Sequence, residues 1–139
     1  MIIGGVAVGL HGYVRKSVTA SGQVVEKIDM DLWYRPTHQN YYNLLKAVEE
    51  LGKDVKRYRN TTFVDPTKSF FRFEFDEYTL DLLPCIKAPI KFSEAFARRD
   101  VFTSNGIEIS LICLADLIQD KEVSPRPKDI NDIRNLRPE

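Results

Sequence analysis

The chain has few cysteines and histidines, no excess of charge of either sign, and no long hydrophobic run. Its two cysteines, Cys85 and Cys113, lack Cys-x-x-Cys spacing. This disfavours a disulfide framework or a zinc site and predicts buried free thiols in a reducing cytoplasm. Lys and Arg number 20, as do Asp and Glu, so the formal net charge is zero. That balance argues against a surface that coats nucleic acid by charge, but it leaves room for a local basic patch.

The apolar opening run, residues 1–10, lacks a basic leader and a clear cleavage site, and His11-Gly12 ends it far short of a membrane span. We therefore expect a cytoplasmic protein that does not engage a membrane. The 139 residues, 43% hydrophobic and 29% charged, contain no repeat or linker. They predict a single domain, 1–139, with one core.

Periodicity and turn residues predict an α/β or α+β domain with one mixed sheet. A short strand at 1–3 precedes an apolar helix at 6–12, and a loop or small hairpin at 13–27 leads to a strand at 28–34. A helix at 40–51 ends at Gly52. Hairpins follow at 69–83 and, around Asn105-Gly106, at 101–112, before helices at 113–121 and 128–136.

Two carboxylates, Asp29 and Asp31, are spaced i,i+2 in the strand at 28–34. Side chains alternate across a strand, so both leave one face while Ile28, Met30 and Leu32 leave the other. Their mutual repulsion is best relieved by an oxygen-preferring divalent cation such as Mg²⁺. The alternative is an edge strand whose polar face lies in water.

A third carboxylate, Asp81, lies between Leu80 and Leu82, which we expect to face the core. If its strand neighbours the acidic strand, the three carboxylates converge and can hold two divalent ions for phosphoryl-type transfer. Alone, an aspartate in a half-exposed strand is more often solvated.

The Gly4-Gly5 turn between the first strand and its helix would let a phosphate approach the backbone closely. Arg15 and Lys16 could hold phosphate charge. The alternatives are an ordinary tight turn and a solvated loop.

Together these segments resemble the nucleotidyltransferase fold superfamily, and most closely its small bacterial branch of minimal and toxin-like enzymes. The matching residues are Gly4-Gly5, His11-Gly12, Arg15, Thr19, Asp29-x-Asp31, Leu80-Asp81-Leu82-Leu83-Pro84, Leu117-Ile118-x-x-Lys121 and Arg126-Pro127-Lys128-Asp129-x-x-Asp132-x-x-x-Leu136. The resemblance spans nearly the whole chain and implies a mixed β-sheet flanked by helices.

The resemblance implies an enzyme that transfers an NMP from an NTP to a hydroxyl acceptor and releases pyrophosphate. The triphosphate would lie on Gly4-Gly5, and Mg²⁺ or Mn²⁺ would be bound by Asp29, Asp31 and Asp81. Asp81 would also help to deprotonate the acceptor. ATP is one candidate substrate, and the acceptor could be a protein, an RNA or a small molecule.

The resemblance extends the nucleotide site to Arg15, Lys121, Lys128 and Asp129. For Lys128 and Asp132 the alternative is an exposed charge pattern on a helix. His11 is expected to be a buried, hydrogen-bonded helix residue rather than a catalytic base.

Two features depart from the family pattern. The Gly-Gly turn begins at residue 4, so the N-terminal helix of relatives is missing, and we expect a homodimer partner or an antitoxin-type protein to cover the sheet, or a loosened fold. Residues 20–27 also lengthen the connection after Thr19, which weakens the case for Thr19 as a site residue. Two other functions stay open: a catalytically weak nucleotide- or partner-binding module of a toxin-antitoxin or regulatory pair, and a two-metal phosphodiester hydrolase.

Overall fold

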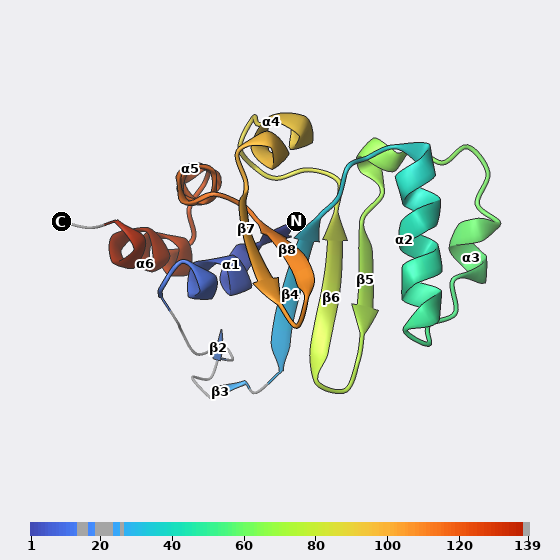
Figure 1. Cartoon of the computed structure of the whole chain (residues 1–139), viewed down its shortest axis with the longest axis horizontal. Helices are drawn as coiled ribbons and strands as arrows, with labels where there is room; N and C mark the ends of the chain where they lie inside the picture. Colours follow the sequence, from blue (N-terminus) through green and yellow to red (C-terminus); the bar gives the residue numbers. More distant parts are fainter. Residues whose placement is uncertain (14–16, 19–23, 26, 138–139) are drawn as a thin grey trace.

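The computed structural model describes residues 1–13, 17–18, 24–25 and 27–137 (Figure 1). Its strands are β1 (Ile2–Ile3), β2 (Ser17–Val18), β3 (Val24–Val25), β4 (Ile28–Trp33), β5 (Phe71–Glu74), β6 (Tyr78–Leu83), β7 (Asp100–Ser104) and β8 (Ile107–Leu111). Six strands form one sheet in the order β5-β6-β4-β1-β8-β7, while β2 and β3 form a separate hairpin. The β4–β6 and β1–β8 pairs are parallel and the other pairs antiparallel, which confirms the predicted mixed sheet.

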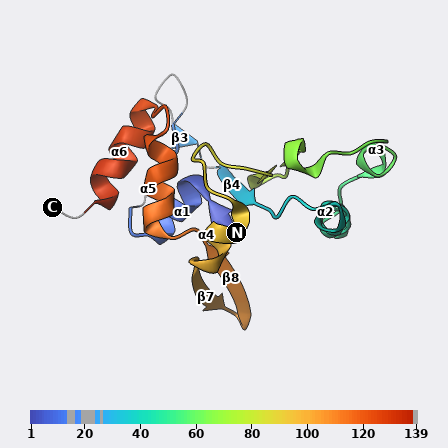
Figure 2. The same cartoon turned by 90° about the horizontal axis from the view of Figure 1, so that it is seen from above.

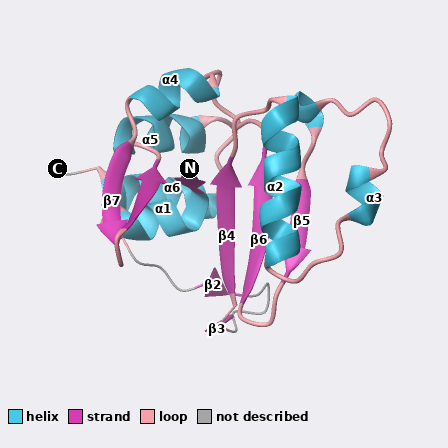
Figure 3. Cartoon of the chain, turned by 45° about the vertical axis from the view of Figure 1, so that its right-hand side comes forward, coloured by secondary structure: helices cyan, strands magenta, loops and turns pink. Residues whose placement is uncertain are grey.

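The helices are α1 (Gly4–Leu10), α2 (His38–Glu50), α3 (Lys56–Arg59), the 3-10 turn η1 (Pro66–Lys68), α4 (Phe92–Ala97), α5 (Leu114–Glu122) and α6 (Pro127–Leu136). Seen from above, α2 and α3 lie at one end of the molecule, and α1, α5 and α6 gather at the other (Figure 2). Figure 3 shows α2 in front of β6 and β5. The sheet therefore has helices at both of its ends, and the domain combines one mixed sheet with separate groups of helices.

The apolar core consists of two clusters. The first joins β1 to α1, α5 and α6, and includes Val8, Ile112 and Leu117. The second packs Tyr41, Leu45 and Val48 of α2 against β5 and β6. These three residues recur at helical spacing, which is why the sequence predicts this helix well. Members of the second cluster on β6 are Leu80 and Leu82.

Turn and capping residues set several element boundaries: Gly52 and Asn105-Gly106 act as predicted, whereas α2 begins at His38, two residues before its predicted start. The side chain of Thr37 accepts a hydrogen bond from the Asn40 amide at 3.1 Å and starts α2, and Gly52 follows its end with φ +98°. Asn105 and Gly106 have φ +51° and +77°, the signs that a tight β-hairpin turn requires. The sequence reading missed α3, η1 and α4, because elements of six residues or fewer show too little periodicity.

Three of the predicted residues lie outside the described part of the chain, and the two cysteines differ from their predicted burial. Arg15, Lys16 and Thr19 lie outside the described residues. Cys85 and Cys113 are free, as predicted, but neither is fully buried: Cys85 is exposed and Cys113 is partly buried. Within the described ranges, none of the helices is long and apolar enough to span a bilayer.

Candidate functional site

The register of β4 and β6 brings the predicted acidic residues onto one face of the sheet. Asp31 is paired with Asp81, and Asp29 with Thr79, in a parallel ladder. Residues that are paired across two strands point to the same face, and positions i and i+2 on one strand share a face. Asp29, Asp31 and Asp81 therefore lie on the same side, opposite Leu80 and Leu82 in the core under α2. The strand of Asp81 thus neighbours the strand of Asp29 and Asp31, as the predicted acidic site requires.

Asp31 lies directly against the first turn of α1. A Cβ placed on Gly4 would come within 2.3 Å of Asp31 Oδ2, and Gly4 has φ +68°. Only glycine tolerates both the contact and the backbone angle at low cost. The space beside Gly4 is therefore occupied by the Asp31 carboxylate, whereas the sequence predicted that a phosphate would approach the backbone at this turn.

The surroundings of Asp31 disfavour its charged form. Burial is the largest cause, and together with the charges of Asp81 and Asp29 and a hydrogen bond with Asp81 it raises the pKa of Asp31 to about 6, against a lowering by the charge of Lys128. Such a raised pKa arises where like charges meet beside a core, and a bound cation would reverse it.

Asp81 has one partner that the sequence reading missed. Its Oδ1 atom is buried without a hydrogen bond and lies 3.7 Å from Arg72 Nε. Arg72 faces Asp81 in the β5–β6 register. A buried carboxylate oxygen that lacks a donor is suited to a metal ion or a proton.

The described residues contain no group of three or more His, Cys, Asp or Glu side chains already gathered closely enough to hold a metal ion. The donor chemistry nevertheless fits Mg²⁺ or Mn²⁺: carboxylate oxygens alone, with Asp31 and Asp81 coupled and Asp29 exposed two residues along the same face. Metal binding by these three residues stays a prediction.

A cavity of about 550 Å³ begins at Asp31 and extends toward the C-terminal helices. Its wall includes four predicted site residues, Gly4, Asp31, Lys121 and Asp129. Leu83, Ile86 and Leu117 provide its apolar part, and Lys87, Asp120, Ser124 and Arg126 add polar groups that the sequence reading had not assigned to the site. A volume of this size is in the range of small-molecule sites.

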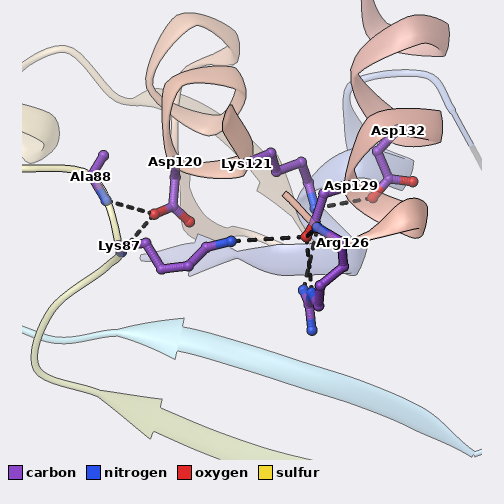
Figure 4. Close-up of polar contacts among 7 residues, drawn as sticks. All are labelled: Lys87, Ala88, Asp120, Lys121, Arg126, Asp129 and Asp132. Carbon is purple, nitrogen blue, oxygen red and sulfur yellow. Dashed lines mark hydrogen bonds and ion pairs between the residues drawn. The ribbon is translucent and has the colours of Figure 1, made fainter. Parts of the chain in front are cut away.

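Lys121 and Asp129 of the cavity wall belong to a buried ion cluster (Figure 4). Lys121 Nζ of α5 lies 3.3 Å from Asp129 Oδ1 and 3.0 Å from Asp132 Oδ2, both on α6. All three residues are at most 5% exposed. The alternative of an exposed charge pattern is therefore wrong for Asp132. The i,i+3 spacing of Asp129 and Asp132 places both carboxylates on the helix face that meets Lys121.

Asp129 also binds Arg126, which begins α6. Oδ2 of Asp129 accepts hydrogen bonds from Nε and from the backbone N–H of Arg126, both at 2.9 Å. Burial by itself would raise the pKa of Asp129, but these hydrogen bonds and the charges of Lys121 and Arg126 outweigh it, so the pKa lies well below its usual range. Asp129 therefore stays ionised and holds the guanidinium of Arg126 and the ammonium of Lys121.

The remaining predicted residues lie around this cavity rather than in its wall. Gly5 belongs to the first turn of α1, and Lys128 acts on Asp31 through its charge. His11 directly follows α1, and its Nε2 lies 2.7 Å from the carbonyl oxygen of Ile112. The predicted hydrogen bond is present, but His11 is only partly buried and stands just outside the helix rather than within it.

The signals for the missed residues were weak in the sequence. Arg72 precedes Phe73 in an alternating strand, which indicated only a solvent-facing position. Arg126 stands three residues before Asp129, a spacing that predicts a contact at a helix start. A comparison of the chain with protein-family models and with curated proteins finds no match.

Proposed function

We propose that this chain is a Mg²⁺-dependent nucleotidyltransferase of the nucleotidyltransferase fold, which moves an NMP from an NTP to a hydroxyl acceptor. The observation that carries the proposal is the pairing of Asp31 with Asp81 on one sheet face, beside a cavity whose wall also holds Lys87, Lys121 and Arg126. Carboxylates that can hold a metal ion and cations that can hold phosphate, gathered at one cavity, match the two needs of a metal-bound triphosphate.

In this proposal Asp29, Asp31 and Asp81 would hold the divalent cation, which when bound neutralises phosphate charge and polarises the α-phosphoryl group. Arg126 would bind the triphosphate, with its guanidinium fixed at the cavity wall by Asp129, which is itself held by Lys121. Gly4 keeps the space into which Asp31 projects.

The chemical step needs a proton acceptor, and Asp81 Oδ1 has no hydrogen bond of its own. The acceptor hydroxyl would lose its proton to Asp81 as its oxygen bonds to the α-phosphorus. The bond between the α-phosphorus and the bridging oxygen then breaks, and pyrophosphate leaves with that oxygen. Arg126 would stabilise the charge that develops on this leaving group.

The proposal places the protein in the cytoplasm, where NTPs are abundant, and leaves three acceptor classes: a protein, an RNA or a small molecule. A homodimer partner or an antitoxin-type protein remains part of the proposal. Neutral overall charge favours a local contact with any RNA acceptor over broad coating.

Label transfer tests this function. Purified protein is incubated with Mg²⁺ or Mn²⁺, each of the four α-labelled NTPs, and cell lysate as a source of acceptors. We expect label from one or more NTPs on an acceptor and none with the Asp29→Ala, Asp31→Ala double variant. Lys46→Gln, an exposed substitution on α2, is the matched control and should retain transfer. Absence of transfer above the double variant for all four NTPs would refute the enzyme.

One observation favours a second candidate, a catalytically weak nucleotide- or partner-binding module. Arg72 lies 3.7 Å from Asp81 and competes with a cation for the carboxylate. In that case the chain would bind an NTP without transferring label. Arg72→Gln separates the two candidates: it should increase metal-dependent binding in both, but give transfer only if the chain is an enzyme.

A further inference from the structure

The segment between β6 and α4 crosses one side of the cavity and is fixed to α5 by Asp120. Oδ1 of Asp120 accepts the backbone N–H of Lys87 at 2.6 Å and that of Ala88 at 2.9 Å (Figure 4). Hydrogen bonds to a carboxylate are about twice as strong as those between neutral groups. Two of them on consecutive amides fix the backbone position from which the Lys87 side chain extends.

The Lys87 side chain extends from this segment toward α6. Its Nζ lies 3.8 Å from Asp129 Oδ2, the same oxygen that accepts a hydrogen bond from Arg126 Nε at 2.9 Å. Figure 4 shows Lys87 and Arg126 reaching this carboxylate from different elements. The Lys87 side chain is 41% exposed, whereas that of Lys121 is 6% exposed. Lys121 is thus occupied by buried carboxylates, and Lys87 presents a solvent-accessible ammonium to the cavity.

We propose that Lys87 is a phosphate-binding residue of this cavity and that Asp120 is the residue that positions it. The inference rests on the proposed function, and it deepens it by assigning the β- and γ-phosphates of the NTP to the end of the cavity formed by Lys87 and Arg126. Asp31 belongs to the wall of the same cavity, and the reacting α-phosphorus would lie beside it. Asp129 Oδ2 now accepts a hydrogen bond from Arg126 and forms an ion pair with Lys87, and a phosphate oxygen between the two cations would accept hydrogen bonds from both.

The first test uses inorganic tripolyphosphate with Mg²⁺, because this probe carries the phosphates without a base. Binding is measured by titration calorimetry for the full chain, Lys87→Gln and the control Lys46→Gln. We expect Lys87→Gln to weaken binding about tenfold, the usual loss for one charge-assisted contact, and Lys46→Gln to bind as the unaltered chain does. Equal affinity of Lys87→Gln and the unaltered chain, or no binding by the unaltered chain, would overturn the proposal.

The second test separates positioning by Asp120 from an effect of its charge. Asp120→Ala removes the acceptor of both amides and should weaken tripolyphosphate binding, whereas Asp120→Asn keeps a carbonyl oxygen and should retain it. The loss from Asp120→Ala should largely vanish in a chain that already carries Lys87→Gln, because Asp120 acts through Lys87. A full additional loss in that double variant, or tighter binding by both Asp120 variants, would overturn the positioning role.

These results are separable from the proposed function. If tripolyphosphate binding depends on Lys87 but no α-label is transferred, the phosphate site stands and the transferase does not. If label is transferred and Lys87→Gln binds tripolyphosphate normally, the transferase stands and the assignment of Lys87 is wrong.

Discussion

Gly4 and Asp31 approach so closely that a single methyl group on Gly4 would lie 2.3 Å from Asp31 Oδ2. Gly4 also has φ +68°, an angle that L-residues rarely adopt. Gly4 thus links the start of α1 to the acidic strand, and a side chain at this position would have to displace the Asp31 carboxylate.

We expect Gly4→Ala to lower the free energy of unfolding by about 1–3 kcal/mol, through steric contact and backbone strain, and to displace the Asp31 carboxylate. Urea unfolding measures the first effect, and metal-dependent tripolyphosphate binding measures the second. Gly9→Ala in the same helix is the control, since a Cβ there would meet nothing within 4 Å. Gly9→Ala should be neutral or stabilising by about 0.5–1 kcal/mol. Similar losses in the two variants would contradict the role of Gly4.

The raised pKa of Asp31 makes stability depend on pH. Its value of about 6 in the folded protein exceeds the ordinary 3.8, so the folded state holds a proton that the unfolded chain has lost. Stability should therefore fall as pH rises from about 4 to about 6, with the loss complete above that range. Asp31→Asn has no carboxyl group to ionise at this position. Its free energy of unfolding should be about 2 kcal/mol higher than that of the unaltered chain near pH 7.5, and similar to that of the unaltered chain near pH 4. A stability difference that does not change with pH would rule out this coupling.

The coupling between Asp81 and Asp31 can be measured directly. Asp81→Asn removes the largest neighbouring charge that raises the pKa of Asp31, so that pKa should fall from about 6 toward its ordinary value. Carboxyl NMR titration reports the shift without any substrate. Glu77→Gln, a charge change in the turn before β6, serves as the control and should leave the Asp31 titration unchanged. An unshifted titration in Asp81→Asn would mean that the two carboxyl groups do not interact.

The ion cluster of α5 and α6 should be essential for stability. Lys121→Met leaves Asp129 and Asp132 without their buried cation, and we expect a loss of about 3–5 kcal/mol in the free energy of unfolding. Lys121→Arg retains the charge and should recover part of the loss, while Lys46→Met on the exposed face of α2 should change stability by less than about 0.5 kcal/mol. A loss below about 1 kcal/mol in Lys121→Met would show that the cluster is not a stabilising unit.

The sequence predicted those parts of the fold that depend on local rules. The helical spacing of Tyr41, Leu45 and Val48, the turn at Asn105-Gly106 and the alternation of Leu80 and Leu82 about Asp81 each specify an element without reference to the rest of the chain. The shared face of Asp29 and Asp31 follows from the period of a strand.

The rest depended on which elements meet in space. No local pattern pairs Arg72 with Asp81, because that contact arises from the register of two strands in a hairpin. The bond between Asp120 and the backbone of Lys87 joins residues 33 positions apart. The burial of Asp132 likewise requires α5 to pack against α6, so an i,i+4-type charge pattern alone could not separate a buried ion pair from a solvated one.

The central claim is that Asp29, Asp31 and Asp81 act as one divalent-cation site that serves a nucleotide. Mn²⁺ binding followed by electron paramagnetic resonance, with a non-reactive NTP analogue present, tests it most directly. The account predicts analogue-dependent Mn²⁺ binding that falls at least tenfold in each of Asp29→Asn, Asp31→Asn and Asp81→Asn, and that is unchanged in Lys46→Gln. Mn²⁺ binding that is the same in all four variants, or that ignores the analogue, would contradict the account.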